Sequence, residues 1–210
     1  DILAVVATIF GLATSLGFGA QQAASGLDYL FGISSGINVQ MAIITGVTAV
    51  ALISVLRGLD GGVKILSNIN MSLAGILMFF VIFAGPTMEI LQTLWITSSS
   101  YVTNVVPLSN PFGRDDEAWF QGWTVFYWAW WISWSPFVGM FIARVSKGRT
   151  VREFVTAVLI VPTVITVVWM SAFGGAAIEQ IQQGVGELAE NGLTEVSLAT
   201  FQMFANLPLT

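Results

Sequence analysis

Four tryptophans fall within seven consecutive residues of the stretch TVFYWAWWISWSPF, which covers 124–137. They are Trp128, Trp130, Trp131 and Trp134, and the stretch contains no charged residue. An indole ring face attracts cations, and the attraction is worth about 2 kcal/mol or more when the cation is desolvated. A quaternary ammonium group cannot donate an ordinary hydrogen bond, so a carboxylate offers it little geometric advantage over a ring face. The cluster therefore predicts a site for a methylated cation.

The residue inventory excludes several other kinds of chemistry. The chain has no Cys and no His, which excludes thiol chemistry, imidazole bases and the common zinc sites. Ser133 and Ser135 have no plausible general base in the sequence, so we do not expect an enzyme. The basic residues form no patch of the kind that binds nucleic acid, and no cofactor is expected.

Long uncharged runs indicate a polytopic helical membrane protein. Of 210 residues, 55% are hydrophobic and only 9% are charged, whereas a soluble domain has about 25% charged residues. The mean hydropathy is +0.81. A bilayer core about 30 Å thick requires roughly 20 apolar residues of helix. We therefore predict an all-α fold with five transmembrane helices, at about 2–30, 39–57, 65–94, 118–146 and 151–175, where charged residues at the ends belong to the loops.

The remaining segments have other compositions. Gly85-Pro86 is expected to kink the third helix. Residues 95–117 mix polar and apolar side chains and predict an interfacial helix and loop. The tail 179–196 is polar and acidic, and another helix could begin in 197–210. Neither end shows a signal peptide, and we interpret the chain as an internal piece of a longer protein.

Basic residues are concentrated in two loops, which sets the expected orientation. Six of the seven Lys and Arg residues lie in the loops after the second and fourth helices: Arg57, Lys64, Arg144, Lys147, Arg149 and Arg152. Cytoplasmic loops carry such an excess of basic residues. We therefore expect both loops on the cytoplasmic side, and helix 118–146 to run from outside to inside.

Depth in the membrane separates the tryptophans into two groups. Trp119 and Trp123 lie near the outer end of helix 118–146, where aromatic residues anchor at the headgroup level. Trp131 lies about 20 Å deeper, at a rise of about 1.5 Å per residue, and so near the midplane. Core packing is an alternative role, although membrane helix interfaces favour small residues over indoles. One helix face carries most of the rings: Trp119, Trp123, Tyr127, Trp130 and Trp134. An aromatic face that reaches the midplane favours a binding site.

Pro136 lies in the same stretch and removes one backbone donor from the helix. The carbonyl of Ile132 loses its helical partner as a result. In hydrocarbon, such a carbonyl must be satisfied by protein, water or an ion. Because Ser133 and Ser135 add hydroxyl groups nearby, we expect a polar cavity at this depth.

Three segments together resemble one family of transporters. They are ATIFGLATSLGFGAQQAASGLDYLFGI at 7–33, LSNINM at 66–71 and FYWAWWISWSPFVGMFIARVSKGRTVREF at 126–154. Their order and spacing are similar to those of the betaine/choline/carnitine transporter (BCCT) family, and the last segment resembles its highly specific signature. The resemblance covers essentially all 210 residues.

The resemblance implies a fold and a division of the chain. Members of the family have twelve transmembrane helices in an inverted-repeat, sodium-symporter-like fold. This chain would match about the fifth to ninth of them. Residues 1–112 would hold the last three helices of the first repeat and the start of an outer interfacial helix or loop. Residues 113–210 would hold the first two helices of the second repeat and an outer acidic loop.

The resemblance also implies which residues bind substrate. The family's substrate box consists of Trp and Tyr from the fourth and eighth helices, and helix 118–146 would supply the eighth-helix part. Trp131 matches the box position. Trp130 and Trp134 match neighbours that line the site and the pathway, and Trp128 matches another pathway tryptophan. Since the fourth helix is not in this chain, the chain would hold only part of the box and would be inactive alone.

A sodium site is implied at Thr8 and Phe137. Sodium-coupled members use hydroxyls of the fifth helix and an aromatic residue of the eighth, and these two residues match such positions. Leu12 stands where some members carry a second threonine, and a structural hydroxyl bonded to its own helix is the alternative role for Thr8. Sodium-independent carnitine exchangers carry an arginine that aligns with Met71. Because no Lys or Arg occurs inside a span, Na⁺ is the expected coupling ion and H⁺ the alternative.

We therefore predict a secondary active transporter, a symporter of quaternary ammonium compounds such as glycine betaine, choline or carnitine, which serve in osmoprotection. It would be a multi-pass protein of the bacterial inner membrane, with the bilayer and a small substrate as partners, and a homotrimer is left open. The alternatives are an ion channel subunit and a structural membrane bundle. A channel pore has charge rings or repeated carbonyls, and the sequence shows neither.

Overall fold

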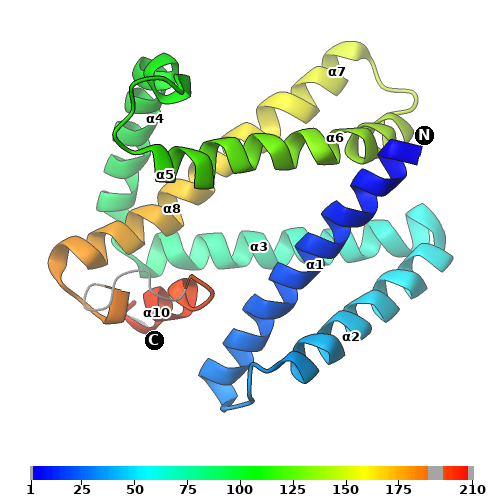
Figure 1. Cartoon of the computed structure of the whole chain (residues 1–210), viewed down its shortest axis with the longest axis horizontal. Helices are drawn as coiled ribbons and strands as arrows, with labels where there is room; N and C mark the ends of the chain where they lie inside the picture. The colour runs from blue at the N-terminus through cyan, green and yellow to red at the C-terminus, as the bar shows by residue number, and fades with distance from the viewer. Residues whose placement is uncertain (1, 189–195, 208–210) are drawn as a thin grey trace. The chain divides into compact units, whose positions relative to one another are not determined.

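A computed structural model describes residues 2–188 and 196–207, and within this part the chain is helical and has no strand (Figure 1). The predicted all-α fold class is thereby confirmed. The helices are α1 (Ile2–Phe31), α2 (Ile37–Leu56), α3 (Lys64–Ala84), α4 (Thr87–Ser109), α5 (Glu117–Trp119), α6 (Phe126–Val145), α7 (Val151–Val155), α8 (Val161–Gln183) and α10 (Ala199–Ala205). Three π-helical turns, Leu59–Val63, Phe120–Val125 and Thr156–Ile160, run directly into α3, α6 and α8.

The prediction of one kinked helix over 65–94 is wrong, because the structure has two helices there. Helix α3 ends at Ala84, Gly85 takes an extended backbone (φ −89°, ψ −171°), and α4 begins at Thr87. Pro86 has no N–H to donate and disfavours helical backbone at the residue before it. The Thr87 hydroxyl donates to the Ile82 carbonyl at 2.6 Å, which satisfies an acceptor at the end of α3. The helix is therefore interrupted completely between α3 and α4, where the sequence predicted only a kink.

The segments after this break differ in part from expectation. Helix α4 continues to Ser109, through much of the segment predicted as an interfacial helix and loop, and a loop follows over 110–116. The further helix expected in 197–210 is present as the short α10. Of the acidic tail, Glu190 and Glu195 lie outside the described residues.

Four helical stretches of the described chain are long and apolar enough to cross a bilayer. They cover 2–31, 37–56, 61–84 and 151–183. The fifth predicted span, 118–146, is helical almost throughout but does not reach the same hydropathy, because indole, hydroxyl and proline side chains contribute little to it. Since no charge lies between Ala118 and Ala143, a fifth span remains a prediction.

The chain divides into two compact units, and the second of them contains a packed core. This unit consists of residues 17–96 and 166–210. Its core side chains are contributed by α3, α4, α8, α10 and the segment after α8: Val81, Ile90, Ala172, Ala176, Leu188 and Met203. Gln180 Nε2 donates to the Met203 carbonyl at 2.9 Å. Apolar packing and one buried hydrogen bond thus hold α10 on α8.

The first unit consists of residues 1–16 and 97–165, so it contains the first half of α1 and all of α6. Helix α1 offers a small residue, Gly11, where a side chain of α6 comes close. Small residues allow membrane helices to approach each other closely. This approach positions the aromatic residues described below.

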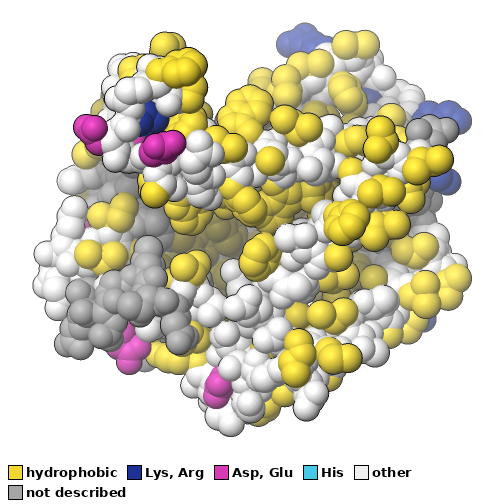
Figure 2. All heavy atoms as spheres, in the orientation of Figure 1, with side chains coloured by type: hydrophobic (Ala, Val, Ile, Leu, Met, Phe, Trp, Pro, Cys, Tyr) yellow, Lys and Arg dark blue, Asp and Glu magenta, His cyan; other side chains and the backbone are white. Residues whose placement is uncertain are grey.

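Most large apolar side chains of both units are exposed. Figure 2 shows hydrophobic side chains over much of the visible surface of α1, α2 and α6. Examples with well over half of the side chain exposed are Phe10, Leu56, Ile76, Val106 and Leu159. A water-soluble monomer rarely exposes such continuous apolar surface. The surface is therefore suited to lipid or to further apolar helices.

Candidate functional site

The aromatic side chains that lead into α6 contact one another along the helix. The rings of Trp123 and Tyr127 are stacked at a centroid distance of 6.1 Å, and those of Tyr127 and Trp130 at 5.9 Å. Phe126 meets the Trp130 ring edge-on at 5.6 Å. Side chains three and four residues apart are neighbours on a helix surface. The rings therefore form a continuous ladder along one side of the helix.

Two cavities flank this ladder, with volumes of 250 and 270 Å³. The first is named the α1-side cavity, because α1 supplies part of its wall: Ala7, Phe10, Gly11, Thr14, Phe126, Ala129, Trp130, Ser133 and Trp134. The second is named the tryptophan cavity, and its lining is Tyr127, Trp130, Trp131, Trp134 and Val138. Trp130 and Trp134 line both, so their rings form a wall shared by the two cavities. Neither lining contains a charged side chain.

Three of the four tryptophans singled out in the sequence come together at the tryptophan cavity. Trp130, Trp131 and Trp134 all line it, and 70% of Trp131 is exposed. Trp128 is also largely exposed but lines neither cavity. The structure therefore groups Trp131, which was expected at the box position, with Trp130 and Trp134, and leaves Trp128 on a different face.

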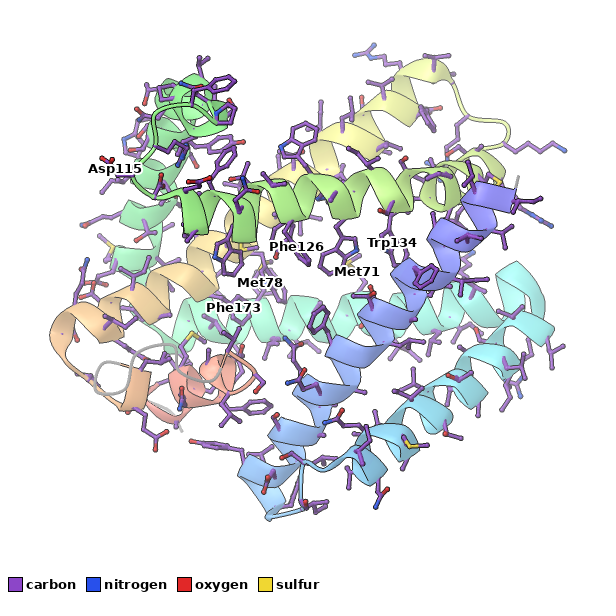
Figure 3. All side chains as sticks on the ribbon, in the orientation of Figure 1. Met71, Met78, Asp115, Phe126, Trp134 and Phe173 are labelled. Carbon is purple, nitrogen blue, oxygen red and sulfur yellow. The ribbon has the colours of Figure 1, made fainter. Side chains whose placement is uncertain are left out.

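Trp134 differs from Trp131 because its polar atom is buried. Its indole Nε1 is inaccessible and has no hydrogen-bond partner among the described residues. Phe126 and Trp134 extend from the same side of α6 (Figure 3), and both line the α1-side cavity. The Trp134 ring also meets Phe137 edge-on at 5.8 Å. Since a buried N–H without an acceptor is costly, packing must hold this ring in place.

The backbone around Pro136 is satisfied within the helix. The Ser135 hydroxyl donates to the Ile132 carbonyl at 2.8 Å, which is the acceptor that the proline deprives of its partner. The Ser133 hydroxyl donates to the Ala129 carbonyl, also at 2.8 Å. These bonds remove the reason for expecting a polar cavity here, and the cavities that α6 does line are mainly aromatic and aliphatic.

The two expected sodium ligands lie on different helices and have local partners. The Thr8 hydroxyl donates to the Ala4 carbonyl at 2.7 Å, which is the structural role considered for it above. Phe137 packs on Trp134. Neither residue lines either of the two cavities. Thr8 and Phe137 as a sodium site therefore remain a prediction.

Comparison with known proteins identifies the family. The model of the betaine/carnitine/choline family transporters, BCCT, matches residues 1–210. The chain belongs to the BCCT family. Membership agrees with the tryptophan-rich signature on α6 and with the long apolar helices. This BCCT chain is accordingly a multi-pass protein of the bacterial inner membrane.

Three relatives show how much of a BCCT protein the chain represents. It is 67% identical over 208 residues to Glycine betaine transporter 1 of Vibrio parahaemolyticus, an alignment that covers 99% of this chain and 40% of the relative. A glycine betaine/proline/choline/ectoine transporter of the same organism is 59% identical over 208 residues, which are 99% of this chain and 37% of the relative. Glycine betaine transporter OpuD of Bacillus subtilis is 46% identical over 213 residues, with 100% and 41% covered. The chain thus spans about two fifths of the length of these relatives.

Several residues of the site were not expected from the sequence of this BCCT chain. Ala7, Gly11 and Thr14 line the α1-side cavity from α1. Their spacing of four and three residues places them on one helix face, and this periodicity is the signal in the sequence. It does not reveal which helix packs against that face, because α1 and α6 are far apart along the chain.

Proposed function

We propose that this chain is the central part of a symporter for quaternary ammonium compounds such as glycine betaine, choline or carnitine. Membership of the BCCT family supports transport. The relatives at 67% and 46% identity are named as glycine betaine transporters. Another relative is named for proline and ectoine in addition to betaine and choline, so the substrate range within the family is broad.

The observation that carries the proposal is the lining of the tryptophan cavity. Four aromatic side chains and Val138 surround 270 Å³ without a charged group. A quaternary ammonium group can place its methyl groups on these rings while the ring faces attract its charge. A primary ammonium group would lose its hydrogen bonds to water there, and the Tyr127 hydroxyl is the one side-chain acceptor in the lining that could replace any of them. The cavity therefore favours methylated cations.

The exposed face of Trp131 fits a site that further residues complete. With 70% of the residue exposed, one ring face is left for side chains outside this chain. We place the remaining aromatic residues of the box there. Residues 1–112 and 113–210 would then belong to the first and second repeats of an inverted-repeat fold.

Sodium is the coupling ion that we propose, with Thr8 and Phe137 as contributors. The hydrogen bond to Ala4 uses the hydrogen of the Thr8 hydroxyl, so the lone pairs of the oxygen stay available to a cation. A ring face of Phe137 would add a cation–π contact. Proton coupling is the alternative, and ion replacement separates the two.

Uptake of labelled betaine by the full-length carrier in proteoliposomes tests the proposal. We expect accumulation with an inward Na⁺ gradient and none when K⁺ replaces Na⁺. Accumulation driven by a pH gradient alone would contradict sodium coupling. Liposomes that contain only this 210-residue segment should not accumulate betaine, since the box is incomplete. Steady ionic conductance without betaine accumulation would instead indicate a channel.

A further inference from the structure

Gly11 of α1 lies directly against the indole ring of Trp134. A Cβ atom built on Gly11 would lie 2.8 Å from Trp134 Nε1, 3.1 Å from Cε2 and 3.3 Å from Cδ1. These three atoms form the N–H edge of the five-membered ring. The edge that carries the buried, unpartnered Nε1 therefore rests on the bare backbone of α1.

Space, and not backbone conformation, accounts for a glycine at this position. Gly11 is not among the glycines with positive φ and lies inside α1. Within a helix, glycine is about 1 kcal/mol less favourable than alanine. Two other glycines of α1, Gly17 and Gly19, have open space around the corresponding Cβ position. Only at Gly11, among these three, would a methyl group meet another side chain.

A methyl group at position 11 would change the wall between the two cavities. Trp134 lines both the α1-side cavity and the tryptophan cavity. The methyl group would approach from α1, so the indole would have to move away from α1 and into the tryptophan cavity. The edge-on contact with Phe137 at 5.8 Å restricts rotation of the ring in place.

We propose that Gly11 is a positioning residue that sets the selectivity of the tryptophan cavity. By letting the Trp134 indole withdraw against α1, it leaves the cavity wide enough for a trimethylammonium group. A larger residue at position 11 narrows the cavity and disfavours the third methyl group of the substrate. This role rests on the proposed function, because it assigns the ammonium group to that cavity.

The test uses Gly11→Ala in the full-length carrier, with Gly17→Ala as the matched control on the same helix. Uptake of betaine is measured against uptake of dimethylglycine, which has one methyl group fewer. We expect Gly11→Ala to weaken the apparent affinity for betaine by about tenfold, the lower end of the effect of one methyl group in a pocket. The affinity for dimethylglycine should change much less. Gly17→Ala should leave the betaine-to-dimethylglycine ratio as in the parent.

A double-mutant cycle between Gly11→Ala and Trp134→Phe tests the contact without relying on transport. Phenylalanine removes the ring edge that the new methyl group would meet. We expect Gly11→Ala to lower the melting temperature of the purified carrier when Trp134 is present, and to leave it equal or higher in the Trp134→Phe background.

Three outcomes would overturn the inference. Additive melting temperatures in the cycle would show that the two residues do not interact. Coupled melting temperatures with an unchanged betaine-to-dimethylglycine ratio would leave Gly11 a packing residue without influence on selectivity. A parent carrier that takes up no betaine would contradict the proposed function, and the selectivity role with it, whatever the cycle shows about the contact.

Discussion

Leu188 and Trp131 are both large apolar side chains, but 1% of Leu188 and 70% of Trp131 is exposed. Leu188 belongs to the packed core of the second unit, together with Ala172, Ala176 and Met203. Trp131 lines a cavity whose other walls are mostly rigid rings. Both regions are lined mainly by apolar and aromatic side chains, and they differ in whether the neighbours fill the available volume.

The shapes of the side chains explain this difference. Alanine and methionine adapt to the space around them, one by being small and the other by being flexible, so the core around Leu188 closes. Indole rings are flat and stiff, and a row of them on one helix leaves gaps that only another molecule or another segment can fill. A packed region thus contributes stability, and an aromatic region with gaps is available for binding.

Leu188→Ala should disrupt the packed core of the second unit and have the largest effect on the stability of the protein. Removing a buried leucine side chain and leaving a cavity costs about 2–5 kcal/mol. We expect a lower melting temperature of the purified full-length carrier and an unchanged apparent affinity for betaine in the protein that remains folded. Ile178→Ala on α8 is the control, because 49% of that residue is exposed. Equal decreases in melting temperature from both substitutions would show that the packed core does not contribute more to stability than the exposed surface of α8.

Trp131→Leu should act on the tryptophan cavity, where it should weaken substrate binding and leave the stability of the protein unchanged. Loss of one desolvated ring at the proposed ammonium position should cost on the order of 2 kcal/mol, or about thirtyfold in apparent affinity. Trp123→Leu is the control, because Trp123 belongs to the same ring ladder but lines neither cavity. An uptake titration in which both substitutions have the same effect would mean that the box is misplaced.

The helices could be predicted from the sequence more completely than the site. The run 2–30 is followed by the glycine- and serine-rich segment GISSG at 32–36, and α1 ends at Phe31, directly before it. Gly85-Pro86 signalled an interruption, but the sequence did not distinguish a kink from a full break, since that depends on whether the carbonyls of the preceding turn find other donors. The Thr87 hydroxyl provides one.

The site could be predicted only where it is local in sequence. Trp130, Trp131 and Trp134 lie within one turn and a half of a helix, so their grouping follows from helical periodicity. The contact of Gly11 with Trp134 joins distant segments, and no local pattern specifies such a pairing. The hydrogen bond from the Ser135 hydroxyl to the Ile132 carbonyl could have been predicted from the sequence. In membrane helices, hydroxyl groups near a proline often donate to the carbonyl that the proline leaves without a partner.

Thr8→Val should alter the sodium dependence of uptake, and its effect on uptake should be smaller than that of Trp131→Leu. Valine keeps the shape of threonine and removes only the oxygen. If the oxygen binds sodium, the Na⁺ concentration for half-maximal uptake rises while betaine affinity at saturating Na⁺ stays the same. Thr45→Val on α2 is the matched control, because the Thr45 hydroxyl likewise donates to its own helix, to the Met41 carbonyl at 2.8 Å, and Thr45 lines neither cavity. A sodium dependence identical to that of the parent would exclude Thr8 from the site.

The loop before α5 is the region where we expect the smallest effect, because the Asp116 side chain of its ion pair is 53% exposed. Arg114 donates to both carboxylate oxygens of Asp116, at 2.8 and 2.7 Å, and its guanidinium lies 4.7 Å from the centre of the Phe120 ring. The hydrogen bonds from Arg114 hold the pKa of Asp116 below its ordinary value of 3.8. A pKa lowered by folding means that the pair contributes fully above the ordinary value, and that its contribution is lost as the pH falls through the lowered pKa.

Asp116→Asn should therefore have the smallest effect at neutral pH. The substitution keeps the shape of the side chain and removes the charge that Arg114 holds, and exposed pairs contribute little to stability. We expect faster amide hydrogen exchange in residues 110–116 at pH 7, with no change in melting temperature or betaine uptake. Asp115→Asn is the control, because Asp115 makes no ion pair among the described residues. In the parent, the same faster exchange should appear only below pH 3.8, after correction for the intrinsic exchange rate. The carboxylate of Asp116 stays charged between pH 7 and pH 5, so a rise in exchange over that range would mean that the Arg114–Asp116 pair does not order this loop. The same conclusion would follow if Asp116→Asn and Asp115→Asn changed the exchange equally.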